Sequence, residues 1–168
     1  LKTYLKRKVN VNSCNGSLLW EPWEVLKNDG TPYKVFTPFY KRGCLSASPP
    51  RKPISEKINF FKHNFISMKL SDLNLLENKD WETKILSQWN VGEDTSLEIM
   101  KSFYLNGVKD YSEGRNFPIK KNVSRLSPYL HWGQISPNIL WYELKNLKNV
   151  RENDIEVFKS ELGWREFA

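Results

Sequence analysis

The sequence predicts a mainly α-helical fold with a small amount of β-structure at its start. From residue 80 to the end, apolar side chains recur at the three- and four-residue spacing of an amphipathic helix. Residues 46–79, just before, contain serines and prolines and only weak apolar patterning, which is typical of a linker. Near the start, Val9 and Val11 alternate with polar residues, which is typical of a short strand.

The predicted β-structure lies within residues 1–45. Short strands are predicted for Lys8–Ser13 and Ser17–Trp20, and Tyr33–Phe36 is a third apolar, β-prone run. A Thr-Pro pair then opens a short aromatic turn of helix that ends at Gly43.

The rest of the predicted structure is helical. The predicted helices cover residues 80–89, 94–106, 128–133, 137–147, and 153 or 154 to the end. Asp94 or Thr95 is expected to cap the second helix, and Gly107 to end it, since glycine suits the left-handed position after a helix. Ser127 and Ser136 each stand before a proline, and this pair of residues is a strong start signal for a helix.

The composition favours a polyanionic partner but does not decide the matter. The formal net charge is +7 and 14% of the residues are aromatic. A basic balance suits nucleic acid, and many flat rings suit either packing or a planar ligand. A merely lysine-rich protein fits the charge equally well, so both alternatives stay open.

The cysteines and histidines predict neither a metal site nor a disulfide. Cys14 and Cys44 are isolated in the sequence, as are His63 and His131. This usage indicates a reducing compartment, here expected to be the cytoplasm. No apolar run is long enough to span a bilayer, so no membrane partner is expected.

The ends of the chain predict a fragment of a longer protein. The sequence opens at Leu1 without an initiator methionine, and it closes at Ala168 within a strong helical pattern that has no stop signal. A trimmed coding sequence and an incomplete gene would look the same.

The loop Asn122–Pro137 is the first candidate site. Ser124, Arg125 and Ser127 place two hydroxyls and a cation directly before a predicted helix start. Such groups at the positive end of a helix dipole can hold a phosphate. The alternative is two capped helices joined by a polar turn.

The last helix carries the second candidate. Phe158, Glu161 and Arg165 share one helical face, with Trp164 at its flank. These side chains could line a pocket that is both polar and aromatic. The alternative is a surface pair of Glu161 and Arg165, worth a few tenths of a kcal/mol, with the two rings in the core.

A third constellation pairs Tyr111 with Arg115 four residues later, where they could contact a ligand phosphate and a DNA phosphate. A solvated arginine stacked on tyrosine is the alternative. No other chemistry is indicated, since glycine-rich phosphate loops of the GxGxxG and GxxxxGK[ST] types, HExxH and GxSxG are all missing from the sequence.

Taken together, the motifs YSEGRNFP, SRLSPYLHWGQISP and ELGWREF, in this order, resemble those of the photolyase/cryptochrome flavoproteins. The upstream run WEPWEVLKNDGTPYKVFTPFYKRG is similar to the segment that leaves the N-terminal α/β domain of that family. The resemblance covers most of the chain, is weakest between Ser46 and Lys79, and in detail is closest to the class I enzymes for cyclobutane pyrimidine dimers.

The resemblance implies three parts of the chain. Residues 1–45 would be the C-terminal tail of the α/β antenna domain, residues 46–79 the interdomain linker, and residues 80–168 the first part of an all-helical domain that binds FAD. A second antenna chromophore, of folate or deazaflavin type, is possible in the full-length protein. The protein is expected to be a monomer.

The resemblance also assigns site residues. Positions that match FAD contacts are Tyr111, Val123, Ser124, Arg125, Leu126, Ser127, Phe158 and Arg165. Positions that match the DNA side are Arg115, Glu161, Trp164 and Arg165, and of these Glu161 and Trp164 would be catalytic residues facing the flipped dimer. Many members have threonine where this chain has Val123, which implies one hydrogen bond fewer, worth roughly 0.5–1.5 kcal/mol.

The function implied is blue-light-driven, FAD-dependent repair of cyclobutane pyrimidine dimers in DNA, a carbon–carbon lyase reaction that runs by electron transfer. The fragment alone is expected to be inactive. One alternative is a cryptochrome-type photoreceptor with the same FAD site and no repair activity. Another is a basic helical module that binds nucleic acid without a cofactor, which the combined motifs disfavour.

Overall fold

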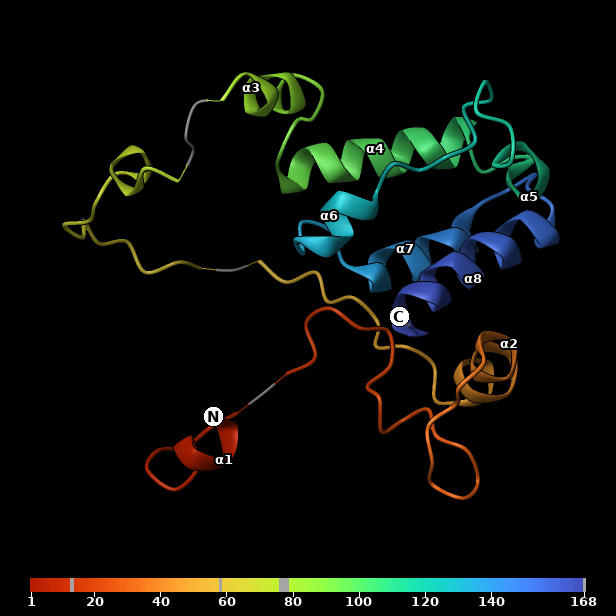
Figure 1. Ribbon diagram of the computed structural model, residues 1–168, viewed down its shortest axis with the longest axis horizontal. Coiled ribbons are helices and arrows are strands. Elements are labelled where there is room, and N and C mark those ends of the chain that lie inside the picture. The colour runs from red at the N-terminus through yellow and green to blue at the C-terminus, as the bar shows by residue number, and fades with distance from the viewer. Residues whose placement is uncertain (13, 58, 76–78, 168) are drawn as a thin grey trace.

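The protein is mainly helical in the computed structural model, which describes residues 1–12, 14–57, 59–75 and 79–167 (Figure 1). The helices in these ranges are α1 (Lys2–Leu5), α2 (Phe36–Pro38), α3 (Asp80–Leu86), α4 (Glu93–Asn106), α5 (Tyr111–Gly114), α6 (Ser127–His131), α7 (Pro137–Glu143) and α8 (Glu152–Phe167). Tighter or wider turns are the π-helical η1 (Phe39–Gly43) and the 3-10 turns η2 (Cys44–Ser46), η3 (Leu70–Leu73) and η4 (Leu144–Asn146).

The predicted strands are wrong: the described residues contain no strand, only one isolated antiparallel bridge between Leu26 and Pro32. The reason lies in where the backbone N–H groups go. In the first run, the N–H groups of Lys8 and Val9 both donate to the carbonyl of Leu5, which continues a helical turn. Ser13, the last residue of that prediction, lies outside the described residues.

The other two predicted strands lack a neighbouring strand as well. In the run Ser17–Trp20, the N–H groups bond to side chains rather than to another backbone segment. In the run Tyr33–Phe36, Phe36 already belongs to α2. The predicted aromatic turn of helix does form here, as α2 and η1, and it continues through η2 beyond Gly43.

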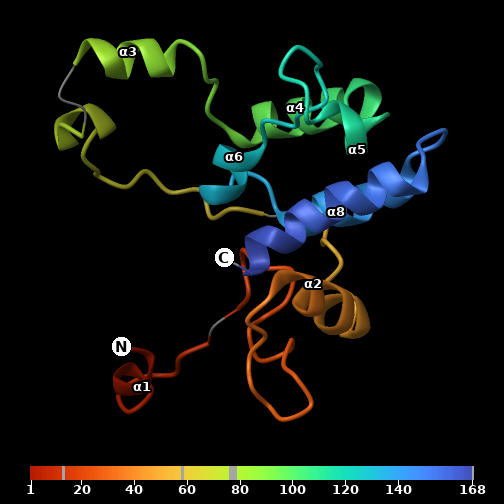
Figure 2. The same ribbon diagram turned by 45° about the vertical axis from the view of Figure 1, so that its right-hand side comes forward.

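The predicted linker runs away from the helices (Figures 1 and 2). Its start is tied down, because the indole Nε1 of Trp20 donates to the carbonyl of Ser48 at 2.9 Å and the hydroxyl of Tyr142 donates to the carbonyl of Pro50. Beyond Pro50 the described residues of the linker are exposed, and η3 is its one short helical turn among the residues that can be described. The division of the chain at residues 45 and 79 stays a prediction.

The helices predicted for the second half are confirmed as α3, α4, α6, α7 and α8, but three of their end signals differ. Helix α4 starts after Gly92 rather than at a side-chain cap. Gly107 has φ −105°, outside the left-handed region. It must be glycine for another reason, since a Cβ there would lie 2.6 Å from Cδ2 of Phe103. Ser136 does cap α7, accepting from the N–H of Asn138 at 3.2 Å.

Ser127 does not act as an N-cap. It is the first residue of α6, and Leu126 is the residue before the helix. The hydroxyl of Ser127 is therefore not used to satisfy a helical N–H, and the side chain is available to the cavity described below.

The core joins the N-terminal segment to the helices. Leu140 of α7 and Leu144 of η4 are completely buried in a core cluster to which α4 and α8 also contribute residues. The ring of Trp20 packs edge-on against that of Trp141, with centroids 5.3 Å apart, so a residue from the predicted α/β tail lies inside the helical core. This contact holds Trp20 beside α7.

Helix α8 approaches η1 closely at Gly163. A Cβ at Gly163 would lie 2.5 Å from Cδ2 and 2.7 Å from Cε2 of Tyr40, a ring that is itself 5% exposed. We expect Gly163→Ala to lower the free energy of unfolding by about 2 kcal/mol, because a buried ring must shift. Gly16→Ala is the control, since nothing lies within 4 Å of its added Cβ. Urea unfolding measures both, and equal midpoints would contradict the prediction.

Candidate functional site

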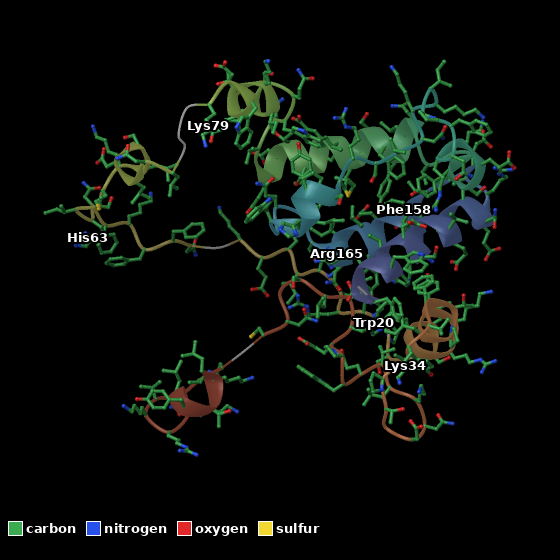
Figure 3. All side chains as sticks on the ribbon, viewed as in Figure 1. Trp20, Lys34, His63, Lys79, Phe158 and Arg165 are labelled. Carbon is green, nitrogen blue, oxygen red and sulfur yellow. The ribbon has the colours of Figure 1, made fainter. Side chains whose placement is uncertain are left out.

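A cavity of about 530 Å³ lies between α5, α6, α8 and the N-terminal segment. Its lining brings together side chains from four parts of the chain: Ser17, Leu18, Tyr111, Ser124, Ser127, Leu130, His131, Phe158, Glu161, Leu162 and Arg165. Six of the predicted site residues are among them, namely Tyr111, Ser124, Ser127, Phe158, Glu161 and Arg165. Figure 3 shows Phe158 and Arg165 along α8, with Trp20 close to the end of that helix.

Asp154 sets the position of α5 against α8. Its side chain is completely buried, and it accepts from the N–H of Asp110 at 3.1 Å and from the N–H and hydroxyl of Ser112 at 2.8 and 2.7 Å. Arg151 adds a hydrogen bond from Nε at 3.0 Å. The carboxylate thus occupies the start of α5 in the way an N-cap would, although it comes from another helix.

With α5 held in this way, Arg115 meets Glu161 across the two helices as an ion pair at the edge of the cavity. Each side chain is about one-third exposed. The guanidinium also lies over the ring of Tyr111, 5.6 Å from its centroid. The hydrogen bond to Glu161 raises the pKa of Arg115, while burial raises the pKa of the Tyr111 phenol and keeps it protonated.

The apolar wall of the cavity is aromatic. Phe158 is 3% exposed and meets the rings of Phe103, Tyr104 and Tyr111 with centroids 5.0, 6.3 and 5.3 Å apart. Both alternatives for this residue therefore hold at once: it belongs to the core, and one part of it lines the cavity.

Of the candidates in the proposed phosphate loop, some line the cavity and the others do not. Ser124 and Ser127 line it. Val123 is 54% exposed, and Leu126 is buried in the core with an exposed fraction of 1%. Arg125 has φ +54°, and its guanidinium lies over the ring of Trp89, 4.7 Å from the centroid. The left-handed backbone there turns Arg125 away, so the structure does not bring it to the cavity lining.

Trp164 lies beside the cavity and not within its lining. Its ring stacks on that of Phe36 with centroids 3.7 Å apart, and the residue is 46% exposed. Sequence spacing placed it at the flank of the Phe158 face, which is where it is found, but it could not show the contact with a helix more than a hundred residues earlier.

Several lining residues were not predicted. His131 follows Ser127 at i, i+4 on α6, and Leu162 follows Phe158 in the same way on α8, so helical spacing carried a signal for both. Nothing in the sequence could have pointed to Ser17 and Leu18, because their place depends on tertiary contacts. For Asp154, which anchors α5, the sequence predicts only a position at the start of a helix.

The lining suits a ligand with both phosphates and flat rings. Hydroxyls, a guanidinium and an imidazole can donate to phosphate oxygens, and the rings of Tyr111 and Phe158 offer an apolar wall. In the described part of the chain, no group of three or more metal-ligating side chains is found. Nor is any described helix both long and apolar enough to cross a membrane.

Comparison with known proteins gives consistent matches. A family model described as DNA photolyase matches residues 1–56. The deoxyribodipyrimidine photo-lyase of Agrobacterium fabrum is 37% identical over 168 residues, covering 95% of this chain and 34% of that protein. Cryptochrome-2 of Arabidopsis thaliana is 26% identical, covering 98% of this chain and 29% of that protein.

Among solved structures, a bacterial class III photolyase from Agrobacterium tumefaciens superposes with a TM-score of 0.87 at 36% identity, covering 99% of this chain and 35% of that one. The chain thus spans about a third of the length of these relatives. The motifs had indicated class I enzymes, whereas this solved relative is of class III, so the match does not support the class I detail.

Proposed function

Because the chain belongs to the photolyase/cryptochrome family, we propose that it carries part of the FAD site and of the DNA-facing surface of a light-driven repair enzyme for cyclobutane pyrimidine dimers. The observation that supports this most is the cavity itself. Six residues matched to flavin or DNA contacts, from segments up to about fifty residues apart, line one space.

The polar side chains of the cavity would bind the phosphates of FAD. Ser124 and Ser127 can donate hydroxyl hydrogens, and Arg165 supplies a charge-assisted donor. Phe158 and Tyr111 would exclude water beside the ring system. In its reduced, excited form, bound FAD would supply the electron that opens the cyclobutane ring and would take the electron back once the ring has split. Val123 is 54% exposed and outside the cavity lining, so the polar contacts proposed here do not depend on a hydroxyl at that position.

The DNA side would consist of Arg115, Glu161 and Trp164. One face of the Trp164 ring is covered by Phe36, which leaves the opposite face for a base flipped out of the duplex. Arg115 neutralises Glu161 in the pair, so a bare carboxylate would not oppose the negative charge that forms on the dimer. The net charge of +7 implies an affinity for DNA that falls with salt.

The second candidate function is a photoreceptor of cryptochrome type. It is favoured by the matches to plant cryptochromes, which cover nearly all of this chain. The two candidates share the flavin cavity and differ in repair, so one assay separates them.

The test replaces the corresponding third of the Agrobacterium photolyase by this chain. We expect the chimera to purify with FAD and to repair a dimer-containing oligonucleotide under blue light. A chimera that retains FAD but repairs nothing would favour the photoreceptor. A folded chimera without FAD would overturn the proposal. Because the chain spans about a third of its relatives, residues 1–168 alone are expected to bind FAD more weakly than micromolar and to repair nothing.

Within this chimera, we expect Glu161→Ala to lower the repair yield several-fold while FAD content stays the same. The change removes the carboxyl group that faces the proposed substrate side and leaves Arg115 unpaired. Glu156→Ala is the matched control, since Glu156 lies on the same helix and pairs with Lys159. An unchanged yield in Glu161→Ala would remove the catalytic role proposed for this residue.

A further inference from the structure

The segment Asn15–Trp20 forms one wall of the cavity. Ser17 and Leu18 line it, and the two residues that follow, Leu19 and Trp20, are 3% and 5% exposed. The carboxamide of Asn15 accepts from the N–H groups of Ser17 and Leu18 at 3.2 and 2.9 Å, which shapes the segment into a turn. A wall made in this way has no strand or helix to keep it in place, so other contacts must do so.

Besides the contacts of the Trp20 ring with Trp141 and Ser48, Glu166 holds the backbone of this wall. Its side chain is 1% exposed, and Oε2 accepts from the N–H of Leu19 at 2.8 Å and from that of Trp20 at 3.4 Å. These are the last two backbone donors of the segment. The carboxylate therefore ties the N-terminal segment to the end of α8, 147 residues away in sequence.

The same carboxylate also orients a cation of the cavity. Oε1 accepts from Nη1 of Arg165 at 2.9 Å, and Arg165 itself lines the cavity. Arginine has many rotamers when unpaired, so an ion pair to a buried, immobile partner restricts where the guanidinium points. Burial raises the pKa of Glu166, while the bonds from Leu19, Trp20 and Arg165 act in the opposite direction.

We propose that Glu166 is a positioning residue of the cavity, which holds Asn15–Trp20 as a wall and fixes the guanidinium of Arg165 toward the phosphates of a bound flavin nucleotide. The part that concerns the ligand rests on the proposed function. The part that concerns the wall does not, because it follows from the contacts of Glu166 with Leu19 and Trp20.

The test uses the 168-residue chain with Glu166→Gln, Glu166→Asp and the control Glu156→Gln. Glutamine keeps the size of the side chain but removes its charge, and aspartate keeps the charge on a shorter stem. Glu156 lies on the same helix, outside the cavity lining, and it is 45% exposed. Urea unfolding establishes first that each variant is folded.

Amide hydrogen exchange at Leu19 and Trp20 tests the wall. We expect exchange to be about tenfold faster in Glu166→Gln, partly restored in Glu166→Asp, and unchanged in Glu156→Gln. Unchanged protection of these two amides in a folded Glu166→Gln variant would contradict the proposal that Glu166 holds the wall.

The ratio of FAD affinity to riboflavin affinity, from fluorescence titrations, tests the fixing of Arg165. Riboflavin lacks phosphates, so only the affinity for FAD depends on a guanidinium that contacts them. A loss of structure alone would weaken the binding of both ligands alike. We expect the ratio to fall roughly fivefold in Glu166→Gln and to stay the same in Glu156→Gln. An unchanged ratio would reduce Glu166 to a structural role.

If the wild-type chain shows no saturable FAD binding even at high ligand concentration, the same ratio is measured in the chimera with the Agrobacterium photolyase. A chimera that binds FAD but keeps its ratio in Glu166→Gln would overturn the ligand part alone, whereas a folded chimera without FAD would overturn the proposed function. Hydrogen exchange at Leu19 and Trp20 tests the wall in either case.

Discussion

Asp154→Ala is expected to lower the free energy of unfolding by about 3 kcal/mol. The carboxylate is completely buried and gathers the N–H groups of Asp110 and Ser112, the hydroxyl of Ser112 and the guanidinium of Arg151. Alanine would leave those donors without their acceptor, at a place where water has little access. The loss should appear in urea unfolding as a lower midpoint.

Glu152→Ala is the control for this change, since Glu152 is an exposed acidic residue in the first turn of the same helix. Its loss should cost only about 0.5 kcal/mol, the usual value for a charge at a helix start. Equal effects of the two substitutions would show that Asp154 acts only through the helix dipole and not as the anchor of α5.

The contribution of Asp154 should also depend on pH. Burial alone would raise its pKa, but the hydrogen bonds from Arg151 and Ser112 outweigh burial and lower the pKa from 3.8 to about 2. Because the folded value lies below the unfolded one, the stabilisation is fully present above about pH 4 and is lost as the pH falls toward 2. Asp154→Asn should flatten the stability curve over this window. A variant curve parallel to that of the wild type would contradict the assignment.

Asp154 also shows the limit of prediction from sequence. Helical spacing located α4 and α8, and the Ser-Pro pairs located α6 and α7, because both signals lie within the segment that forms the helix. The same reasoning failed for residues 8–12, 17–20 and 33–36, because a strand needs a partner that the local pattern does not contain. Some of the acceptors that those N–H groups found are local, such as the carbonyl of Leu5 and the carboxamide of Asn15. Glu166, which accepts from Leu19, lies 147 residues away in the sequence.

The candidate site follows the same division. Phe158, Glu161 and Arg165 could be grouped by their spacing on one helix, and the cavity does contain all three. Their partners could not be derived in that way. The contact of Arg115 with Glu161 depends on how α5 docks, and the segment that contains Ser17 is tied to α8 through the bond from Leu19 to Glu166. Sequence spacing thus identified one wall of the cavity, and tertiary hydrogen bonds built the others.

Phe158→Ala is expected to cost about 3–4 kcal/mol of stability, because it removes the ring at the centre of an aromatic cluster. The ring is 3% exposed and contacts Phe103, Tyr104 and Tyr111, while its remaining side lines the cavity. One edge of the void would open into the existing cavity, so water could enter it, and this places the cost below the upper end for buried phenylalanine. The exposed Phe117→Ala is the control and should change stability by less than about 0.5 kcal/mol.

Phe158→Leu separates packing from ligand binding. Leucine refills most of the volume, so we expect a cost of only about 1–1.5 kcal/mol, yet it removes the flat surface that faces the cavity. In the chimera with the Agrobacterium photolyase, we therefore expect a clear loss of bound FAD in Phe158→Leu, although its free energy of unfolding changes little. If the leucine variant keeps its full FAD content, Phe158 serves the core alone, and the aromatic wall proposed for the flavin must rest on Tyr111.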